Sequence, residues 1–293
     1  MSSFLSEIVK NYDDLKYALL NAHTFDANHY GFPDISYQIM ESDKHRIDVF
    51  KQSFEQYDNF KDAIVCEAGV GRLALTKLYL PYVKKAYLIE SNPNIIGEIW
   101  SIIRANKWED KVELIYGNAM TVNLPEKVDF VVGELMSIFC ANEYQVQIFK
   151  QLRKFLKPEG KLIPEKIINL VQVGSAFFDK EYKHYPLFLT RHLPTTLTTL
   201  VNVNTTDLYN EEEEHVQRTT SFQAILSGRV NCVLLYSWIE LAEGVNFTGS
   251  DSLMPPTVVK LEEEFELKAG QTYELHADYS YGTSLDEAKF WIS

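Results

Sequence analysis

One stretch, residues 63–90, limits the possible folds more than any other part of the chain. Its parts follow in order: the apolar run Ile64–Cys66, the turn Gly69-Val-Gly71, an amphipathic segment at Leu73–Tyr82 and a second apolar run closing on Glu90. A short apolar run predicts a buried strand, paired glycines predict a tight turn, and apolar residues three or four apart predict a helix. The stretch therefore predicts a strand–turn–helix–strand unit of a doubly wound parallel sheet.

The turn in this unit favours a nucleoside ligand. Glycine lets the backbone approach a ligand closely, and a carboxylate at the tip of the second strand can bind both hydroxyls of a ribose. A dinucleotide pattern would place its third glycine at position 74, where the chain has Ala74. Glu67 precedes the turn, where it would repel a pyrophosphate. We therefore expect a ligand that brings a cation to this place.

A second stretch carries two carboxylates, Glu134 and Glu143. Glu134 follows the apolar run Val128–Val132 and so lies at the carboxyl end of a predicted strand, while Glu143 begins a predicted helix that ends at Phe155. Paired carboxylates on one loop can bind a planar guanidinium through several N–H donors and fix which nitrogen faces the cofactor. An alternative is that Glu143 only caps its helix, since the helix dipole favours an acid at the N-terminus.

The pattern changes after Pro164 to short strand-like segments separated by polar turns. These segments are Ile167–Val173, Thr219–Leu226, Asn231–Glu240, Thr257–Phe265 and Tyr273–Tyr281, all rich in β-branched and aromatic residues. The segments predict an antiparallel β-barrel or sandwich at 165–293, after a parallel-sheet domain at 58–164 and N-terminal helices within 1–57 that cover the ligand.

Several smaller elements complete this prediction. Helices are expected at residues 1–24, Ile35–Tyr57 and Asn94–Asn106, a strand at Val112–Tyr116, a turn at Pro158–Gly160 and a solvated loop at Glu211–Glu214.

The composition limits the classes of binding partner that we expect for this protein. A net charge of −13 argues against nucleic-acid or anionic-membrane binding and is compatible with a cationic substrate, although acidity can equally serve solubility alone. Three scattered cysteines predict neither a disulfide framework nor a metal site. The charged N-terminus resembles no targeting signal, and no apolar run reaches membrane length, so we expect a cytoplasmic protein.

Both stretches carry a resemblance to a known family. Glu67-Ala-Gly69-Val-Gly71, followed by Glu90, resembles the first motifs of class I S-adenosylmethionine-dependent methyltransferases. The loop from Glu134-Leu-Met136 to Glu143 resembles the double-glutamate loop of the protein arginine methyltransferases. Two further segments are similar to that family: Met40-Glu-Ser-Asp43-Lys-His-Arg46 to its N-terminal helix, and Leu162-Ile-Pro164 to its junction into the barrel. The resemblance covers residues 25–281 and is strongest at 36–164.

The resemblance implies a Rossmann-like domain that binds S-adenosyl-L-methionine, followed by a β-barrel, and methyl transfer to a guanidinium nitrogen. It implies catalytic roles for Glu134 and Glu143 and substrate contacts from Met40 and Met136. Cofactor contacts are implied for Arg46, through the cofactor carboxylate, and for Glu67, Gly69, Gly71, Glu90, Ala119 and Met120.

The chain also departs from the family. The family's Thr-His-Trp signature would fall at Ser252-Leu253-Met254, so Asp43 lacks the histidine it would pair with and is expected to be a surface charge. Met120 stands where many members have a glutamate, and the arm-like insertion near 178–200 is short. Dimerisation through that arm is therefore not expected, although a homodimer is left open.

We expect the methyl acceptor to be free arginine, a guanidino metabolite or an arginine-containing peptide. Two alternatives stay open. One is a methyltransferase of a non-guanidine amine, with Glu134 as the base, and the other is a cofactor-binding regulatory module without turnover.

Overall fold

The structure is a computed structural model of the 293-residue chain and describes residues 34–178, 182–187, 192–248 and 254–293. The predicted helix at residues 1–24 lies outside the described residues. So do positions 252 and 253, two of the three positions where the family's Thr-His-Trp signature would fall.

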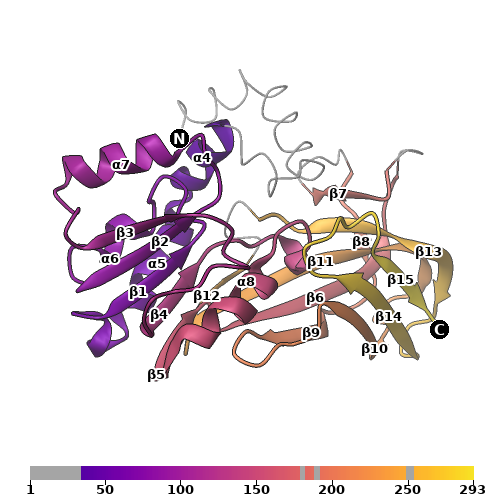
Figure 1. Ribbon diagram of the computed structural model, residues 1–293. Coiled ribbons are helices and arrows are strands. Elements are labelled where there is room, and N and C mark those ends of the chain that lie inside the picture. Colours follow the sequence, from indigo (N-terminus) through magenta and orange to yellow (C-terminus); the bar gives the residue numbers. More distant parts are fainter. Residues whose placement is uncertain (1–33, 179–181, 188–191, 249–253) are drawn as a thin grey trace.

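A parallel sheet occupies the first half of the described chain (Figure 1). Its strands are β1 (Ile64–Ala68), β2 (Lys85–Glu90), β3 (Val112–Tyr116), β4 (Val128–Gly133) and β5 (Leu156–Ile163), in the order β3-β2-β1-β4-β5. Every residue of β1 is buried, as expected for a central parallel strand covered on both faces. The strand order reverses between β1 and β4, and ligands of such sheets bind at the carboxyl ends beside this reversal.

The helices around this sheet are α4 (Asp34–Ser42), α5 (Lys44–Glu55), α6 (Thr76–Tyr79), α7 (Ile96–Ala105) and α8 (Gln145–Leu152), with short 3-10 turns η1 (Asp58–Phe60), η2 (Ile138–Cys140) and η3 (Arg153–Phe155). Helix α7 and strand β3 lie where the sequence predicts them. No helix in the described part of the chain is long and apolar enough to cross a membrane.

The predicted single helix Ile35–Tyr57 is wrong, because the chain breaks it at Asp43. This residue has the non-helical angles φ −76° and ψ 80°, and its carboxylate accepts the N–H of Arg46 at 3.1 Å, which caps α5. Asp43 is only 9% exposed, so the expectation that it is a surface charge is also wrong.

Two other local predictions need correction. The segment Leu73–Tyr82 contains only the short helix α6, because Leu73 has a left-handed φ of 64° that a continuous helix excludes. The predicted turn Pro158–Gly160 lies inside β5. Val128 pairs with Leu156 and Phe130 with Lys161, so these turn-forming residues make an irregularity in the strand instead of ending it.

The second half of the chain is antiparallel. Its strands are β6 (Lys166–Ser175), β7 (His184–Pro186), β8 (Thr195–Thr196), β9 (Val201–Asp207), β10 (His215–Gln223), β11 (Gly228–Ala242), β12 (Val245–Thr248), β13 (Thr257–Leu267), β14 (Thr272–Ser280) and β15 (Lys289–Ile292). One sheet has the order β7-β13-β11-β6-β8, with β12 on β11 and β9 on β6, and another has the order β10-β14-β15. A Rossmann-type domain followed by an antiparallel β-barrel confirms the predicted fold class.

The five predicted barrel strands correspond to β6, β10, β11, β13 and β14, and the sequence did not predict β9 or the short strands. β10 ends at Gln223 rather than Leu226, because Ile225 and Leu226 donate their N–H groups to Leu197 O in a connection outside the ladder.

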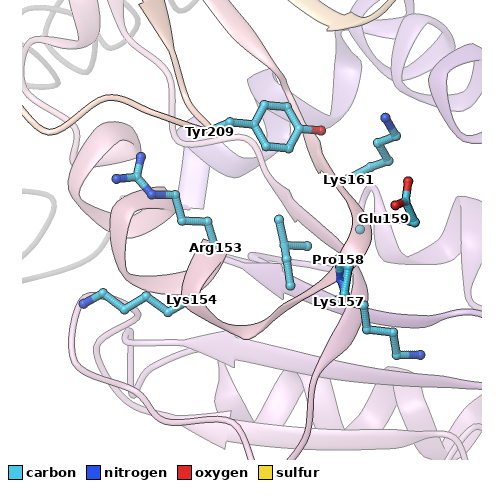
Figure 2. A pocket seen from close by; sticks show the side chains of 9 residues that line it. Arg153, Lys154, Lys157, Pro158, Glu159, Lys161 and Tyr209 are labelled. Carbon is cyan, nitrogen blue, oxygen red and sulfur yellow. The ribbon is translucent and has the colours of Figure 1, made fainter.

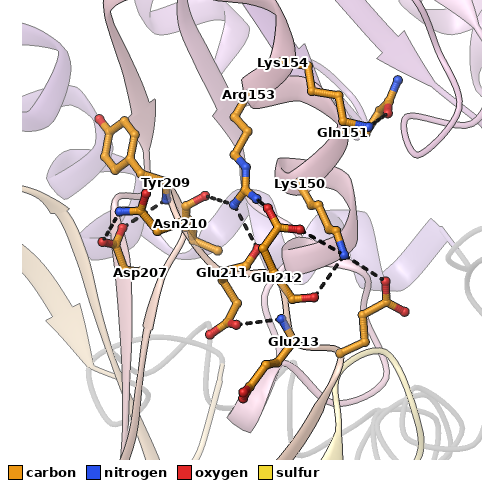
Figure 3. A network of polar contacts seen from close by, with 12 residues as sticks. Lys150, Gln151, Arg153, Lys154, Asp207, Tyr209, Asn210, Glu211, Glu212 and Glu213 are labelled. Carbon is orange, nitrogen blue, oxygen red and sulfur yellow. Dashed lines mark hydrogen bonds and ion pairs between the residues drawn. The ribbon is translucent and has the colours of Figure 1, made fainter.

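The acidic run Glu211–Glu214 connects the two halves of the molecule (Figure 3). Glu212 pairs with Arg153 and with Lys150 Nζ at 3.3 Å, and Glu214 lies 3.6 Å from Lys150 Nζ. The Arg153 guanidinium also donates to the carbonyls of Leu208 and Glu211. The run is an exposed loop, as the sequence predicts, and its ion pairs also make it an interdomain contact onto the end of α8.

Candidate functional site

The predicted site residues gather at the carboxyl edge of the parallel sheet. The N–H of Gly69, after β1, donates to the carbonyl of Ile89 in β2 at 2.9 Å. The N–H of Gly117, after β3, donates to the carbonyl of Glu90 at 2.9 Å, which brings the Gly117–Met120 loop beside the end of β2. Because these strands are parallel, their following turns form one continuous rim.

Glu90 is held rigidly at this rim. Its Oε2 accepts the N–H of Gly71 at 3.0 Å, and its Oε1 accepts those of Ser91 and Asn92 at 2.9 and 2.8 Å. Burial raises the pKa of Glu90, while these three backbone donors lower it. A carboxylate oxygen can accept more than one hydrogen bond, so the anchored group retains acceptor capacity for hydroxyls of a ligand.

The glycine turn is covered by two side chains. Gly69 has φ +66°, and a Cβ there would lie 2.3 Å from Cδ2 of Leu135, in the glutamate loop. A Cβ on Gly71 would lie 3.3 Å from Cε1 of Tyr37 in α4, whose hydroxyl accepts from Asn92 Nδ2 at 3.2 Å. The fold thus brings Tyr37 onto the glycine turn.

Glu67 is bound to helix α6 in this structure. Its Oε2 accepts hydrogen bonds from Thr76 Oγ1 and Tyr79 Oη, each at 2.6 Å, and the residue is 2% exposed. Burial raises the pKa of Glu67 to about 7, although the hydrogen bonds from the two hydroxyl groups lower it. Glu67 therefore ties β1 to α6 beneath the glycine turn, and its cofactor contact stays a prediction.

Arg46 reaches across to the glutamate loop. Its Nη1 donates to Glu134 Oε2 at 2.8 Å and its Nη2 to the carbonyl of Met40 at 2.7 Å. Burial raises the pKa of Glu134, the Arg46 charge lowers it, and the Asp43 charge raises it. Arg46 thus binds Glu134 in this structure, and the contact expected between Arg46 and the cofactor carboxylate stays a prediction.

Glu143 lies near the same charges. Burial raises the pKa of Glu143 to about 8, with a further increase from Glu134 and an opposing effect of Arg46. Helix α8 begins at Gln145, two residues after Glu143, and the N-cap residue Tyr144 makes no side-chain capping bond. Glu143 thus lies one residue before the N-cap, and the alternative that it only caps its helix stays a prediction.

The loop between the two glutamates is bridged by Gln145, which sequence reasoning missed. Gln145 Oε1 accepts the N–H of Leu135 at 2.9 Å, and its Nε2 donates to the carbonyl of Gly133 at 3.4 Å. Gln145 is completely buried. A polar residue at the start of an amphipathic helix gives no sequence signal for this role, because solvent is its ordinary environment there.

The remaining predicted contacts are placed as follows. Met136 is 6% exposed and packs in the core, Met40 is partly buried, and Ala119 is 7% exposed. Met120 is partly buried, and its N–H donates to Asn118 Oδ1 at 2.9 Å. Their roles in binding stay predictions. Within the described residues, no group of three His, Cys, Asp or Glu side chains could hold a metal ion.

A hollow of about 560 Å³ lies elsewhere, around the start of β5 (Figure 2). Leu156, in its lining, pairs with Val128 at the beginning of β4, so the hollow is at the amino ends of the strands, opposite the rim. Lys154, Lys157 and Lys161 line it, but Figure 2 shows their side chains pointing in different directions. These cations do not converge on one ligand position.

The sequence of the first domain matches a family model. Residues 26–163, which contain the glycine turn, Glu90 and both loop glutamates, match the model described as PRMT5 arginine-N-methyltransferase. Residues 26–163 are therefore similar to the protein arginine methyltransferase family.

Relatives that match this part of the chain are found in an archaeon and in a plant. An uncharacterized protein of Methanocaldococcus jannaschii is 30% identical over 158 residues, which are 52% of this chain and 60% of that protein. Protein arginine N-methyltransferase 5 of Oryza sativa subsp. indica is 30% identical over 115 residues, 37% of this chain and 18% of the rice protein. The chain thus spans less than two thirds of the length of these curated relatives.

The likeness to solved structures extends beyond residues 26–163. The Trypanosoma brucei PRMT1 enzyme–prozyme heterotetrameric complex with AdoHcy superposes with a TM-score of 0.70 at 16% identity, over 82% of this chain and 86% of that chain. At this identity the likeness is one of fold, and it includes the barrel half of the molecule.

Proposed function

We propose that this chain is an S-adenosylmethionine-dependent methyltransferase whose acceptor is a guanidinium nitrogen held by Glu134 and Glu143. One observation carries the proposal. Two partly buried carboxyl groups of raised pKa lie on one loop beside the glycine turn, and one of them already binds a guanidinium, that of Arg46. A loop that accepts the Arg46 guanidinium at 2.8 Å has the chemistry to accept another.

The rim fits the cofactor that this reaction needs. Glu90 is fixed by three backbone donors and can accept from ribose hydroxyls, and the turn at Gly69 and Gly71 allows close backbone approach. The Ala119–Met120 loop, beside the end of β2, would contact the base. The relative from Trypanosoma brucei is a complex with AdoHcy, which supports the same ligand class here. When bound, S-adenosylmethionine supplies an electrophilic methyl group.

The residues of this chain would bind and orient the acceptor. Glu134 and Glu143 would each accept N–H bonds from the guanidinium, fix its plane and turn one nitrogen toward the methyl group. Their negative charges would offset the repulsion between two neighbouring cations. The proton displaced from the methylated nitrogen would pass to one of the two carboxylates, and Glu143, with its pKa of about 8, is suited to hold it.

Arginine in a peptide, free arginine and small guanidino compounds are the proposed acceptors. We also propose that the protein acts in the cytoplasm. A homodimer that does not use the arm-like segment near 178–200 is part of the same proposal.

A second candidate acceptor is a non-guanidine amine. The sequence predicts Glu134 as the base for this acceptor. A carboxyl whose pKa is about 8 can take a proton from an ammonium near neutral pH, and because Glu143 has this property, we assign the base to Glu143 instead. One of the two glutamates would then act as the base, and the other would orient the amine.

The proposal is tested by a methyl-transfer assay with labelled S-adenosylmethionine on free arginine, small guanidino compounds, an arginine-rich peptide and simple amines. Glu134→Gln and Glu143→Gln are each expected to lower kcat at least about 100-fold, because each removes a charge on which orientation and charge balance depend. Cofactor affinity, measured by calorimetry, should change little in both variants. Glu263→Gln, an exposed residue on β13, is the matched control and should retain full activity.

Each outcome of this assay separates the candidates. Label in a guanidino product that both active-site variants abolish supports the proposal. Label in an amine alone supports the second candidate. Tight cofactor binding without transfer to any of these acceptors would overturn the enzymatic proposal in favour of a cofactor-binding module.

A further inference from the structure

The glutamate loop has an unusual backbone between its two acids. Phe139, Cys140 and Asn142 have φ values of 61°, 52° and 59°, all in the left-handed region that non-glycine residues rarely occupy. Phe139 and Cys140 are completely buried. Such a conformation persists only where the surrounding structure imposes it, so contacts from outside the loop must hold these residues in place.

A buried chain of hydrogen bonds from the barrel reaches the centre of the loop. The N–H of Phe139 donates to Ser237 Oγ at 2.9 Å, and Ser237 Oγ donates to Asn169 Oδ1 at 2.9 Å. Asn169 Nδ2 in turn donates to Tyr279 Oη at 3.3 Å. Ser237 and Asn169 are inaccessible to solvent, and Tyr279 is 3% exposed. Every link is therefore shielded from competing water.

The barrel strands make this chain rigid. Ser237 in β11 and Asn169 in β6 are direct partners in the antiparallel ladder, so backbone pairing fixes the distance between them. The Phe139 ring packs against Tyr279 and Phe290, with centroids 5.2 and 6.1 Å apart. The loop is thus seated by its backbone and its side chain on the same barrel surface.

The connection between β14 and β15 holds the loop on the other side of Phe139. The N–H of Gly282 donates to the carbonyl of Cys140 at 2.8 Å, and the N–H of Asn142 donates to the carbonyl of Thr283 at 3.0 Å. Both of these contacts use backbone groups. Ser237, by contrast, contributes a side chain, which a single substitution can remove.

We propose that Ser237, supported by Asn169, is a positioning residue that sets the separation and orientation of Glu134 and Glu143. This inference rests on the proposed function. Ser237 lies on the barrel domain and touches neither glutamate, and it acts by holding the left-handed Phe139 turn that lies between them. The barrel domain would then position the two glutamates of the site in addition to contacting the substrate.

The test compares two buried hydroxyls that each accept a backbone N–H. Ser237→Ala leaves the N–H of Phe139 without its acceptor. Thr198→Val does the same to the N–H of Val173, which donates to Thr198 Oγ1 at 3.0 Å in a part of the barrel away from the loop. Thr198 is 1% exposed, so the two changes should have similar costs in thermal stability.

Ser237→Ala is expected to lower kcat by about 10- to 100-fold, because small displacements of orienting groups have large effects on rate. The KM and the cofactor Kd should change by less than about twofold, since the substitution leaves both glutamates and the rim in place. Thr198→Val should leave kcat unchanged, and Ser237→Thr, which keeps the hydroxyl, should restore most of the activity.

A second measurement does not depend on catalysis. Hydrogen exchange of peptides covering residues 134–143, followed by mass spectrometry, should accelerate in Ser237→Ala and not in Thr198→Val. If exchange of this segment is unchanged, or if both variants lose kcat equally, Ser237 has only a structural role. A wild-type protein without methyl transfer would overturn the proposed function, while the exchange comparison would still decide whether Ser237 holds the loop.

Discussion

At the scale of single residues, the chemistry depends on whether Glu143 is charged. Burial and the neighbouring Glu134 raise the pKa of Glu143 to about 8, so most Glu143 carboxyls carry a proton at neutral pH in the free protein. A guanidinium favours the ionised form, because an opposite charge nearby lowers a carboxyl pKa. Binding of the acceptor and loss of this proton are therefore coupled.

This coupling predicts the pH dependence of the reaction. The form of the free enzyme that binds the cation has Glu143 ionised, so kcat/KM should rise about tenfold per pH unit below pH 8 and level off above it. The profile should be recorded between pH 6 and 9.5 with a guanidino acceptor. In Glu143→Gln, the residual activity should lack this rise. A flat wild-type profile through pH 8 would contradict the assignment of the titrating group to Glu143.

At the scale of elements, the break between α4 and α5 aims Arg46 at the loop. Asp43 ends one helix and caps the next, so the first turn of α5 begins at a fixed angle. Arg46 lies in that turn, and its guanidinium spans from the Met40 carbonyl to Glu134. The cap therefore controls a contact between the N-terminal helices and the site.

The cap can be tested by two substitutions that differ in one property. Asp43→Ala should lower the free energy of unfolding by about 1 kcal/mol, because it removes the acceptor for the Arg46 N–H. Asp43→Asn should retain most of the stability, since asparagine caps as well as aspartate. Urea unfolding followed by circular dichroism measures both. Equal losses in the two variants would show that charge, rather than capping, is what Asp43 contributes.

At the scale of the whole molecule, the two domains are joined at the end of α8. Arg153 is the centre of this junction: its guanidinium is largely buried, bonds two carbonyls of the barrel and pairs with Glu212 (Figure 3). Because α8 directly follows the glutamate loop, this junction fixes the orientation of the helix from which the loop emerges.

Arg153→Met should therefore cost about 1.5–3 kcal/mol of unfolding free energy, the usual range for hydrogen bonds to a charged group. The matched control is Glu264→Gln, which breaks the pair between Glu264 and Arg229 on the exposed surface of the barrel domain, and should cost about 0.5 kcal/mol or less. Urea unfolding measures both variants. Similar small losses would mean that the junction contributes no more than an ordinary surface ion pair.

Much of the first domain follows from sequence because its signals are local. An apolar run that ends in an acid predicts β2 and Glu90, and the same reasoning places Glu134 after β4. Parallel strands bring such ends to one rim, so the sequence alone determined which residues would gather there. The errors fell where local signals competed, as at Asp43, whose capping preference divides a continuous helical pattern.

Contacts between distant segments were decided only by the tertiary structure. Arg46 meets Glu134 across 88 positions of sequence, and Phe139 meets Ser237 across 98. The sequence around a serine inside a strand does not indicate its hydrogen-bond partner, because the alternation of residues along a strand predicts only which face of the sheet is buried. The sequence determined the fold class and the acids of the site, whereas the packing of the barrel against the loop decided how those acids are held, since that depends on which groups become neighbours after folding.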